Sequence, residues 1–187
     1  MQRMGRRLLA MAFLGVAAAS SAAAAEPRPE FPAIQVSDLR GQTYDLKNFL
    51  GTATVLNFWA TWCGPCRLEM PELQKLYNEL GGKGLVVLAV DVDLPASATD
   101  EGLAGLLEVL KPRIEFFLSR TGVTLPVYVV DGKTQAALGV DRIPVSILLD
   151  REGKVVRIYS GYSAESVKDL RQQVLGVLAE RSAKGGK

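Results

Sequence analysis

Apolar and polar residues recur with two different periods along this chain, and each period predicts one kind of secondary structure. Short apolar runs bounded by glycine or polar residues predict buried strands. These strands lie at residues 55–59, 85–90 and 125–130. Apolar residues spaced three or four apart predict helices. These helices lie at residues 65–80, in two short helices within 94–120 that Pro112 separates, in a turn at 134–138, and at 164–181.

Two further pairs of strands are predicted to form hairpins, because each pair flanks a short polar turn that contains glycine. The first pairs residues 34–36 with 43–46, and the second pairs 145–149 with 154–159. The order strand, helix, strand over residues 55–90 predicts a parallel pair of strands joined by a crossover helix. We therefore expect an α/β fold with a central mixed sheet, flanking helices, an N-terminal hairpin and a helical insert.

The first 25 residues have the composition of a secretory signal peptide. Three arginines precede an apolar stretch at residues 8–19, and small residues follow up to Ala25. The apolar stretch is shorter than the roughly 20 residues that a membrane-spanning helix needs. We therefore expect export to the periplasm and cleavage near Ala25, with an uncleaved membrane anchor as the alternative. Residues 26–187 then form one domain, which ends in a disordered tail at 182–187.

The charge of the chain gives no indication of a nucleic-acid partner. The whole chain has 22 basic and 20 acidic residues, but three of the basic residues and none of the acidic ones belong to residues 1–25. Cleavage would leave 19 basic against 20 acidic residues. Such a balance lacks the basic surface that is typical of nucleic-acid-binding proteins. We expect the mature protein to be a monomer that binds no nucleic acid.

The chemistry of the chain is concentrated in the sequence Trp62-Cys63-Gly64-Pro65-Cys66, between a predicted strand and a predicted helix. A thiol in the first turn of a helix faces free backbone N–H groups and the positive end of the helix dipole, which favour the thiolate. Cys63 is therefore the expected nucleophile, and Cys66, one turn later, is the expected resolving thiol. Gly64 leaves room for a partner chain, and Pro65 suits the first helical turn. We expect both residues to belong to the substrate-binding surface. This arrangement predicts redox chemistry on disulfides.

A zinc site, a structural bridge and a peroxidase all fit the cysteine pair less well. A tetrahedral zinc site needs about four ligands, whereas the chain has two cysteines and no histidine. A disulfide that closes so short a loop adds little stability, so a purely structural role gives little reason for the pair. A peroxidase has little support, because the redoxin pattern of a single peroxidatic cysteine after a Pro/Thr loop is absent. We expect no metal and no cofactor.

Three motifs give the chain a resemblance to a known family. They are NFWATWCGPCR at residues 57–67, Glu69-Met70-Pro71, and GVDRIP at residues 139–144. With these motifs the chain resembles the thioredoxin superfamily and, within it, the exported TlpA/ResA-like thiol-disulfide oxidoreductases, over roughly residues 31–180. The resemblance implies a thioredoxin-like fold in which Pro144 is cis and lies beside the dithiol. It also implies that Ile143 and Pro144 form a docking edge for the substrate, and we expect Trp62 to belong to the same surface.

Two polar residues near the dithiol carry different expectations. Glu69 lies one turn beyond Cys66 and matches an acid that TlpA/ResA-like proteins retain near the active site. It is therefore the candidate for shifting the pKa of Cys66 or for relaying its proton, with a solvated helix carboxylate as the alternative. Asn57 stands where thioredoxins proper have a buried acid, and an amide cannot transfer a proton in its place. We expect Asn57 to be a buried side chain with its hydrogen bonds satisfied.

The resemblance implies a protein-disulfide reductase. Its substrates would be disulfides of apocytochrome c or of copper-site proteins in respiratory-complex assembly, and a membrane electron donor of the DsbD/CcdA kind would reduce it again. Two alternatives remain open, namely a disulfide oxidant or isomerase and a Cu(I)-binding module that uses both thiolates. Residues 93–112 form a longer connection than is usual in the family. This connection is either a lid or partner-specific surface, or a surface decoration.

Overall fold

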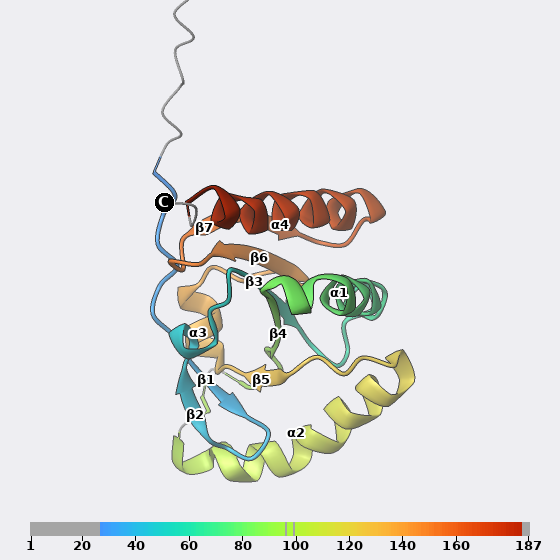
Figure 1. The fold of residues 1–187 in the computed structure, drawn as a ribbon. Coiled ribbons are helices and arrows are strands. Elements are labelled where there is room, and N and C mark those ends of the chain that lie inside the picture. Colours follow the sequence, from blue (N-terminus) through green and yellow to red (C-terminus); the bar gives the residue numbers. More distant parts are fainter. Residues whose placement is uncertain (1–26, 96, 99, 185–187) are drawn as a thin grey trace, which may run out of the picture.

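The computed structural model describes residues 27–95, 97–98 and 100–184. The expected signal peptide and the last three residues of the expected tail lie outside the described residues. The described chain forms one seven-stranded sheet with helices packed against it (Figure 1). The strands are β1 (Gln35–Asp38), β2 (Thr43–Asp45), β3 (Ala53–Trp59), β4 (Leu85–Asp91), β5 (Val127–Val129), β6 (Val145–Asp150) and β7 (Val155–Ser160). The helices are α1 (Cys66–Leu80), α2 (Asp100–Thr121), α3 (Gly132–Ala137) and α4 (Ala164–Lys184), with 3-10 turns η1 (Leu46–Phe49) and η2 (Gly81–Lys83).

The sheet is mixed, and its strand order is β2-β1-β5-β4-β3-β6-β7. β4 pairs parallel with β3 and β5, whereas β3 pairs antiparallel with β6, and the hairpins β1–β2 and β6–β7 are antiparallel. The expected α/β fold with an N-terminal hairpin is therefore confirmed. All seven residues of β3 are buried. The chain that leads into the cysteine motif is thus held between strands on both sides.

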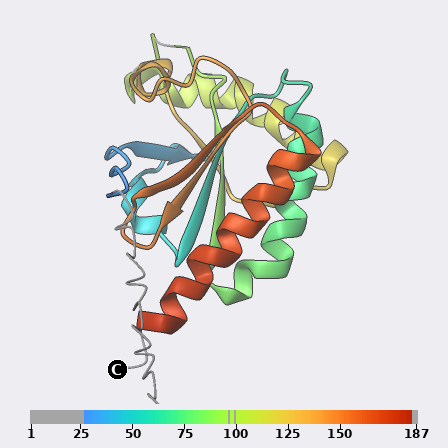
Figure 2. The ribbon, with the colours of Figure 1, turned by 90° about the horizontal axis from the view of Figure 1, so that it is seen from above.

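Helix α1 follows the cysteines, and its apolar face is buried. Figure 2 shows α1 and α4 side by side, and α3 lies on the opposite side of the sheet from them in Figure 1. Pro65 precedes α1 with a φ of −60°, the angle that its ring favours and that a helix needs. α1 ends at Leu80 before Gly81, as expected, but the left-handed turn falls on Gly84, where φ is 105°.

The expectation of two short helices between β4 and β5 is wrong. α2 runs without interruption from Asp100 to Thr121 and includes Pro112. A proline inside a helix removes one hydrogen bond and pushes against the preceding turn, so it bends the helix without always ending it. Figure 1 shows α2 changing direction along its length. The helical spacing of buried apolar residues continues across the proline, so tertiary packing outweighs the local break. These residues are Leu107, Leu110, Ile114 and Phe117.

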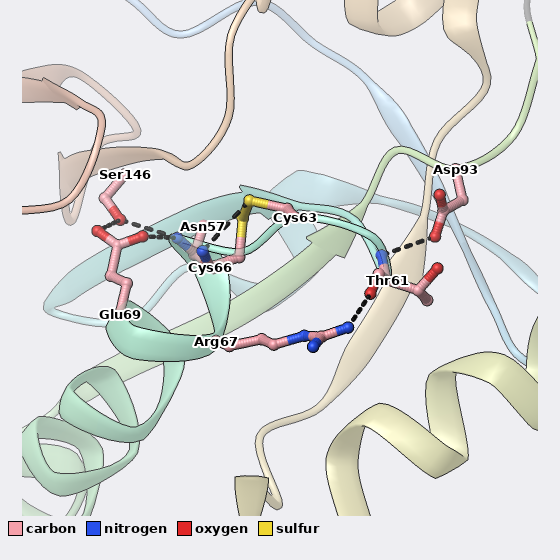
Figure 3. The surroundings of a disulfide bond; sticks show 8 residues. All are labelled: Asn57, Thr61, Cys63, Cys66, Arg67, Glu69, Asp93 and Ser146. Carbon is pink, nitrogen blue, oxygen red and sulfur yellow. Dashed lines mark hydrogen bonds between the residues drawn. A yellow bond between two sulfur atoms is a disulfide. The ribbon is translucent and has the colours of Figure 1, made fainter. Parts of the chain in front are cut away.

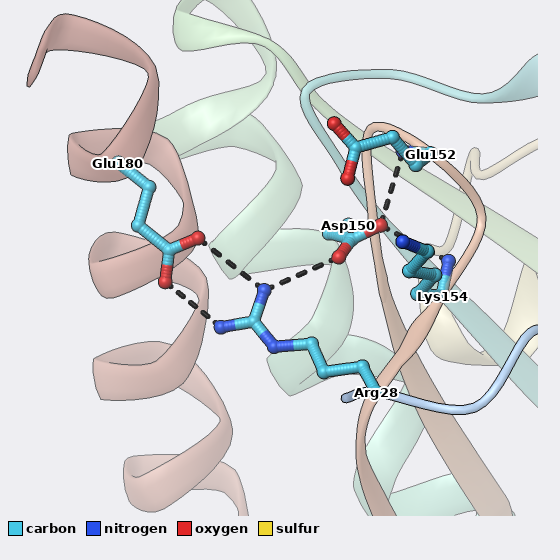
Figure 4. Close-up of polar contacts among 5 residues, drawn as sticks. All are labelled: Arg28, Asp150, Glu152, Lys154 and Glu180. Atoms are coloured by element: carbon cyan, nitrogen blue, oxygen red, sulfur yellow. Dashed lines mark hydrogen bonds and ion pairs between the residues drawn. The ribbon is translucent and has the colours of Figure 1, made fainter. Parts of the chain in front are cut away.

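The end of β6 far from Pro144 is joined to the N-terminal lead and to α4. Arg28 donates hydrogen bonds to Asp150 at 3.2 Å and to Glu180 at 2.8 and 3.3 Å (Figure 4). Asp150 also accepts the backbone N–H groups of Glu152 and Lys154, each at 3.0 Å. α4 itself continues to Lys184, so it includes the first three residues of the expected tail. Among the described residues, no helix has the length and hydropathy needed to cross a membrane.

Candidate active site around the Cys63–Cys66 disulfide

Cys63 and Cys66 form a disulfide between the end of β3 and the start of α1 (Figure 3). Their Cα atoms are 5.3 Å apart, and the side chains are 3% and 0% exposed, respectively. The backbone N–H of Cys66 points at the other sulfur and donates to Cys63 Sγ at 3.2 Å. A donor at a helix N-terminus stabilises negative charge on the atom that it faces. This contact therefore favours a thiolate on Cys63 once the bond is reduced.

The residues next to Cys63 on the outer side of the disulfide are exposed to solvent, although Cys63 itself is buried. The Trp62 side chain is 63% exposed, and Gly64 and Pro65 are exposed as well. A Cβ atom at Gly64 would meet nothing within 4 Å, so the space at this position of the turn is free. The structure thus places three of the expected substrate-binding residues on one accessible surface around Cys63.

The Ile143–Pro144 peptide bond is cis, as the resemblance implied. β6 begins one residue later at Val145, which pairs with Phe58 near the end of β3. This register brings Pro144 to the edge of the sheet from which the cysteine motif emerges. Pro144 is buried and Ile143 is partly exposed, so Ile143 presents the accessible side chain of this pair.

The inner side of the disulfide contains a buried carboxylate. Glu69 is 2% exposed, which excludes the alternative of a solvated helix residue. It accepts hydrogen bonds from Asn57 Nδ2 at 2.8 Å and from Ser146 Oγ at 3.1 Å (Figure 3). Asn57 Nδ2 also donates to Ser146 Oγ at 3.0 Å. The three side chains therefore form a closed polar cluster inside an otherwise apolar core.

Burial raises the pKa of Glu69 from 4.5 to about 7, although the hydrogen bonds from Asn57 and Ser146 oppose this change. Residues three apart on a helix are neighbours, so Glu69 lies beside Cys66 on α1. A carboxyl group with this pKa can both accept and release a proton near neutral pH. The expectation for Asn57 is correct only for its donor, because Asn57 Oδ1 has no hydrogen-bond partner among the described residues.

Two aspartates at the end of β4 support the turn that precedes Trp62: Asp93 contacts the turn, and the buried Asp91 contacts Asp93. Thr61 donates its backbone N–H to Asp93 Oδ2 at 2.8 Å, and Asp93 donates its own N–H to Asp91 Oδ1 at 2.9 Å. Asp91 is fully buried at the end of β4, and no described group binds its Oδ2 atom. Burial, reinforced by the charge of Asp93, raises the pKa of Asp91 to about 8. Asp91 is therefore largely protonated at neutral pH.

Sequence reasoning missed Ser146 and Arg113 as parts of this region. Ser146 is one polar residue in the apolar strand β6, a signal like the one that singled out Asn57, but only the strand register shows that the two residues are paired. Arg113 donates to Thr61 Oγ1 at 3.2 Å from α2. No sequence pattern indicated this contact, because the two short helices that we expected there leave the orientation of Arg113 undefined.

The described residues contain no group of three or more His, Cys, Asp or Glu side chains that could hold a metal ion. The two cysteines, which are the thiol groups that could bind copper, are joined as a disulfide in this structure. A redox-active cysteine pair at a helix start, on this fold, defines a thiol-disulfide oxidoreductase.

The chain belongs to the Redoxin family, whose model matches residues 26–174. The thiol-disulfide oxidoreductase ResA of Geobacillus thermodenitrificans is 34% identical over 145 residues, which are 76% of this chain and 73% of that protein. The ResA protein of Bacillus cereus strain ATCC 10987 is 32% identical over 146 residues, which are 78% and 75% of the two chains. The match to the Redoxin model comes with a cysteine pair instead of a single peroxidatic cysteine.

Comparison with solved structures indicates the same class of protein. A putative thiol:disulfide interchange protein DsbE from Chlorobium tepidum superimposes with a TM-score of 0.66 at 28% identity, over 81% of this chain and 96% of that one. A putative protein disulfide isomerase from Bacteroides thetaiotaomicron gives 0.64 at 26% identity, over 84% and 92%. The resemblance to ResA-like proteins of thioredoxin-like fold is confirmed.

Proposed function

We propose that this protein is an exported protein-disulfide reductase in which Cys63 attacks and Cys66 resolves. One observation carries the choice of Cys63 as the attacking thiol, namely the hydrogen bond from the Cys66 N–H to Cys63 Sγ at the start of α1. This donor lowers the energy of a thiolate on Cys63 and offers no such help to Cys66. The open surface at Trp62, Gly64 and Pro65 supports the approach of a partner protein to the same sulfur.

The reaction starts from the reduced dithiol. The Cys63 thiolate attacks one sulfur of a partner disulfide, so a Cys63–partner bond forms, the partner's own S–S bond breaks, and its released thiolate takes up a proton. The Cys66 thiolate then attacks Cys63 Sγ, so the Cys63–Cys66 disulfide forms, the Cys63–partner bond breaks, and the partner's second sulfur leaves as a thiolate that takes up a proton. Two electrons pass from the protein to the partner in each cycle.

Glu69 serves the second step as the proton acceptor for Cys66. Cys66 is fully buried, where a thiol resists ionisation, and it needs a base to become a nucleophile. Glu69 is buried on the next turn of α1 with a pKa of about 7, so near neutral pH a substantial fraction of it is carboxylate. Asn57 and Ser146 hold its oxygens in place from β3 and β6. Both are positioning residues in this scheme.

The partners are exported proteins that carry disulfides. By resemblance, they are apocytochrome c or copper-site proteins of respiratory-complex assembly, and a membrane donor of the DsbD/CcdA kind restores the dithiol. Ile143 and Pro144 form part of the edge on which such a partner docks. Residues 1–25 act as a signal peptide that is cleaved near Ala25, which the mass of the protein purified from the periplasm tests directly.

The reduction potential of the Cys63–Cys66 pair tests the direction of the reaction. The protein is equilibrated with dithiol buffers of known potential, and the disulfide fraction is measured by alkylation and mass spectrometry. Thioredoxin lies at about −270 mV and the oxidant DsbA at about −120 mV. We expect a value near that of thioredoxin. A value near that of DsbA would contradict the reductase assignment and make the protein an oxidant, whereas Cu(I) bound tightly by the dithiol would favour the metal-binding alternative.

A further inference from the structure

A groove of about 1030 Å³ runs between the start of α1 and the C-terminal half of α2. This volume matches that of large ligand pockets. α2 is fixed beside it because the Phe117 ring packs against Trp59, with 4.4 Å between the ring centres. The groove is therefore a stable feature between two packed helices. Its lining includes Trp62, Arg67, Arg113, Phe116 and Arg120.

The groove carries positive charge without acidic side chains. None of the residues that line it is an aspartate or glutamate, and three are arginines. Arg67 and Arg113 reach Thr61 from α1 and α2, through its carbonyl at 3.5 Å and its hydroxyl at 3.2 Å. Figure 3 shows Arg67 on the opposite side of the disulfide from Glu69. Within residues 27–95, 97–98 and 100–184, none of the three arginines forms an ion pair with a carboxylate.

The groove also exposes two large aromatic side chains. Trp62 is 63% exposed and Phe116 is 69% exposed, although both are strongly apolar. Exposed apolar side chains that gather beside polar groups are typical of protein-binding surfaces. Aromatic residues and arginine are also the residue types that contribute most to binding energy in interfaces. The groove thus combines an apolar floor with guanidinium groups that can pair with carboxylates.

The groove reaches the reacting sulfur directly. Trp62 lines it and immediately precedes Cys63, so a chain that lies in the groove continues past the sulfur that attacks. We propose that the groove binds an acidic segment of the partner polypeptide, with an apolar side chain among its carboxylates, next to the disulfide that Cys63 reduces. The inference rests on the proposed function and adds a substrate class to it. The helical insert then acts as a partner-specific surface through its C-terminal half.

Synthetic peptides with one internal disulfide test this inference. One peptide has Phe, Asp and Glu on both sides of the disulfide, and its matched partner has Lys in place of every Asp and Glu. The protein is reduced with dithiothreitol and desalted, and the rate of single-turnover reduction of each peptide is measured at low salt. We expect the acidic peptide to react at least tenfold faster, because each exposed ion pair contributes about two- to fivefold. The ratio should shrink in 0.5 M salt, where exposed charges are screened.

Two variants separate the groove from the overall charge of the protein. Arg113→Gln combined with Arg120→Gln should lower the ratio of the two rates at least fourfold. Any effect of Arg113→Gln on the dithiol itself, through Thr61, acts on both peptides and cancels in the ratio. The control is Arg151→Gln, which removes the same kind of charge from the exposed turn at the far end of β6 and should leave the ratio within twofold of the wild type.

The outcomes distinguish this inference from the proposed function. Equal reduction of both peptides by the wild-type protein, or an unchanged preference in the double variant, would overturn the inference and leave the reductase assignment standing. Reduction of neither peptide would overturn the proposed function and this inference with it. A preference that the double variant and Arg151→Gln reduce equally would also overturn the inference, since the whole protein's charge would then explain it.

Discussion

The two sulfur atoms of the disulfide face different surroundings. Cys66 lies on the inner side, fully buried, near a carboxylate that hydrogen bonds from two strands hold in place. Cys63 lies on the outer side, where a helix N–H reaches its sulfur and the exposed Trp62 and Gly64 surround it. The inner side is suited to moving a proton in a closed space. The outer side is suited to meeting another protein.

This difference indicates how one dithiol can carry out two distinct steps. Attack on a partner needs a stable thiolate that the partner can reach. Resolution needs a thiol that stays unreactive until the mixed disulfide forms, and then a base to activate it. Both cysteines are buried, but they differ in hydrogen bonding and in neighbouring charge, and this difference agrees with the order of steps that we propose.

Replacing either cysteine should have the largest effect on the reaction, and the two replacements should differ in their results. Cys66→Ala leaves the attacking thiol and removes the resolving one, so a mixed disulfide with a partner protein should accumulate on Cys63. Cys63→Ala should form no such complex and should lose all disulfide reduction. Non-reducing gels of periplasmic extracts, followed by mass spectrometry of the trapped species, measure both results. A partner trapped on Cys66 in the Cys63→Ala protein would contradict the assignment.

Glu69→Gln should slow only the second step of the reaction, in which Cys66 resolves the mixed disulfide. Loss of a general base costs on the order of 100-fold in the step that it serves, so release of the partner should slow by about that factor. The wild-type rate of this step should rise with pH through about 7, as the carboxylate forms, and the variant should lack this rise. Rapid-mixing measurements of mixed-disulfide decay provide the test. Glu72→Gln, on the exposed side of α1 beside Lys75, is the matched control and should leave the profile unchanged.

Glu69 and Asp91, the buried carboxylates near the dithiol, should differ in function, but burial raises the pKa of both, so they should affect stability in the same direction. The pKa of Asp91 is raised from 3.8 to about 8 in the folded protein, so the folded state holds a proton that the unfolded state has lost. The free energy of unfolding should therefore fall as pH rises from about 4 to about 8, by roughly 5 kcal/mol. Asp91→Asn should flatten this fall in urea unfolding curves and keep the wild-type rate profile near pH 7. A change in that rate profile would contradict the claim that Asp91 takes no part in the resolution of the mixed disulfide by Cys66.

Ser146→Ala should produce the smallest of these effects. The Ser146 hydroxyl donates to Glu69 and favours its charged form, so its loss should raise the pKa of Glu69 further. We expect the midpoint of the pH–rate profile to move upward by about one pH unit, since a hydrogen bond to a charged group contributes about 1.5–3 kcal/mol. Ser146→Thr keeps a hydroxyl and should restore the midpoint. An unmoved midpoint in Ser146→Ala would show that Glu69 does not set the profile.

The sequence was sufficient to predict the strand and the helix that hold the dithiol and the cis proline beside it. The apolar run before the cysteines predicted β3, the position of Cys66 predicted the start of α1, and the family motif predicted the cis bond before Pro144. Each of these depends on residues close together in the chain. Local patterns therefore located the dithiol, and the resemblance to a known family located the edge beside it.

The remainder of the site depends on contacts between distant segments. The pairing of Asn57 with Ser146 follows from the register of β3 and β6, although the two residues lie 89 positions apart in the chain. The groove depends on α2, where Pro112 suggested a break that tertiary packing overrides. Burial of Glu69 likewise follows from the strands beneath α1 and from no signal near Glu69 itself. Long-range packing, which sequence spacing does not encode, decides these features.

The order in which the two thiols react tests the central claim most directly. The fully reduced wild-type protein is treated with a limiting amount of iodoacetamide over a range of pH, and peptide mass spectrometry reports which cysteine is alkylated. We predict that Cys63 reacts first, with an apparent pKa below the value of about 8.5 for a free cysteine. Cys66 should remain unmodified under these conditions. Preferential alkylation of Cys66, or an unperturbed pKa for Cys63, would contradict the division between the outer and inner sides of the dithiol.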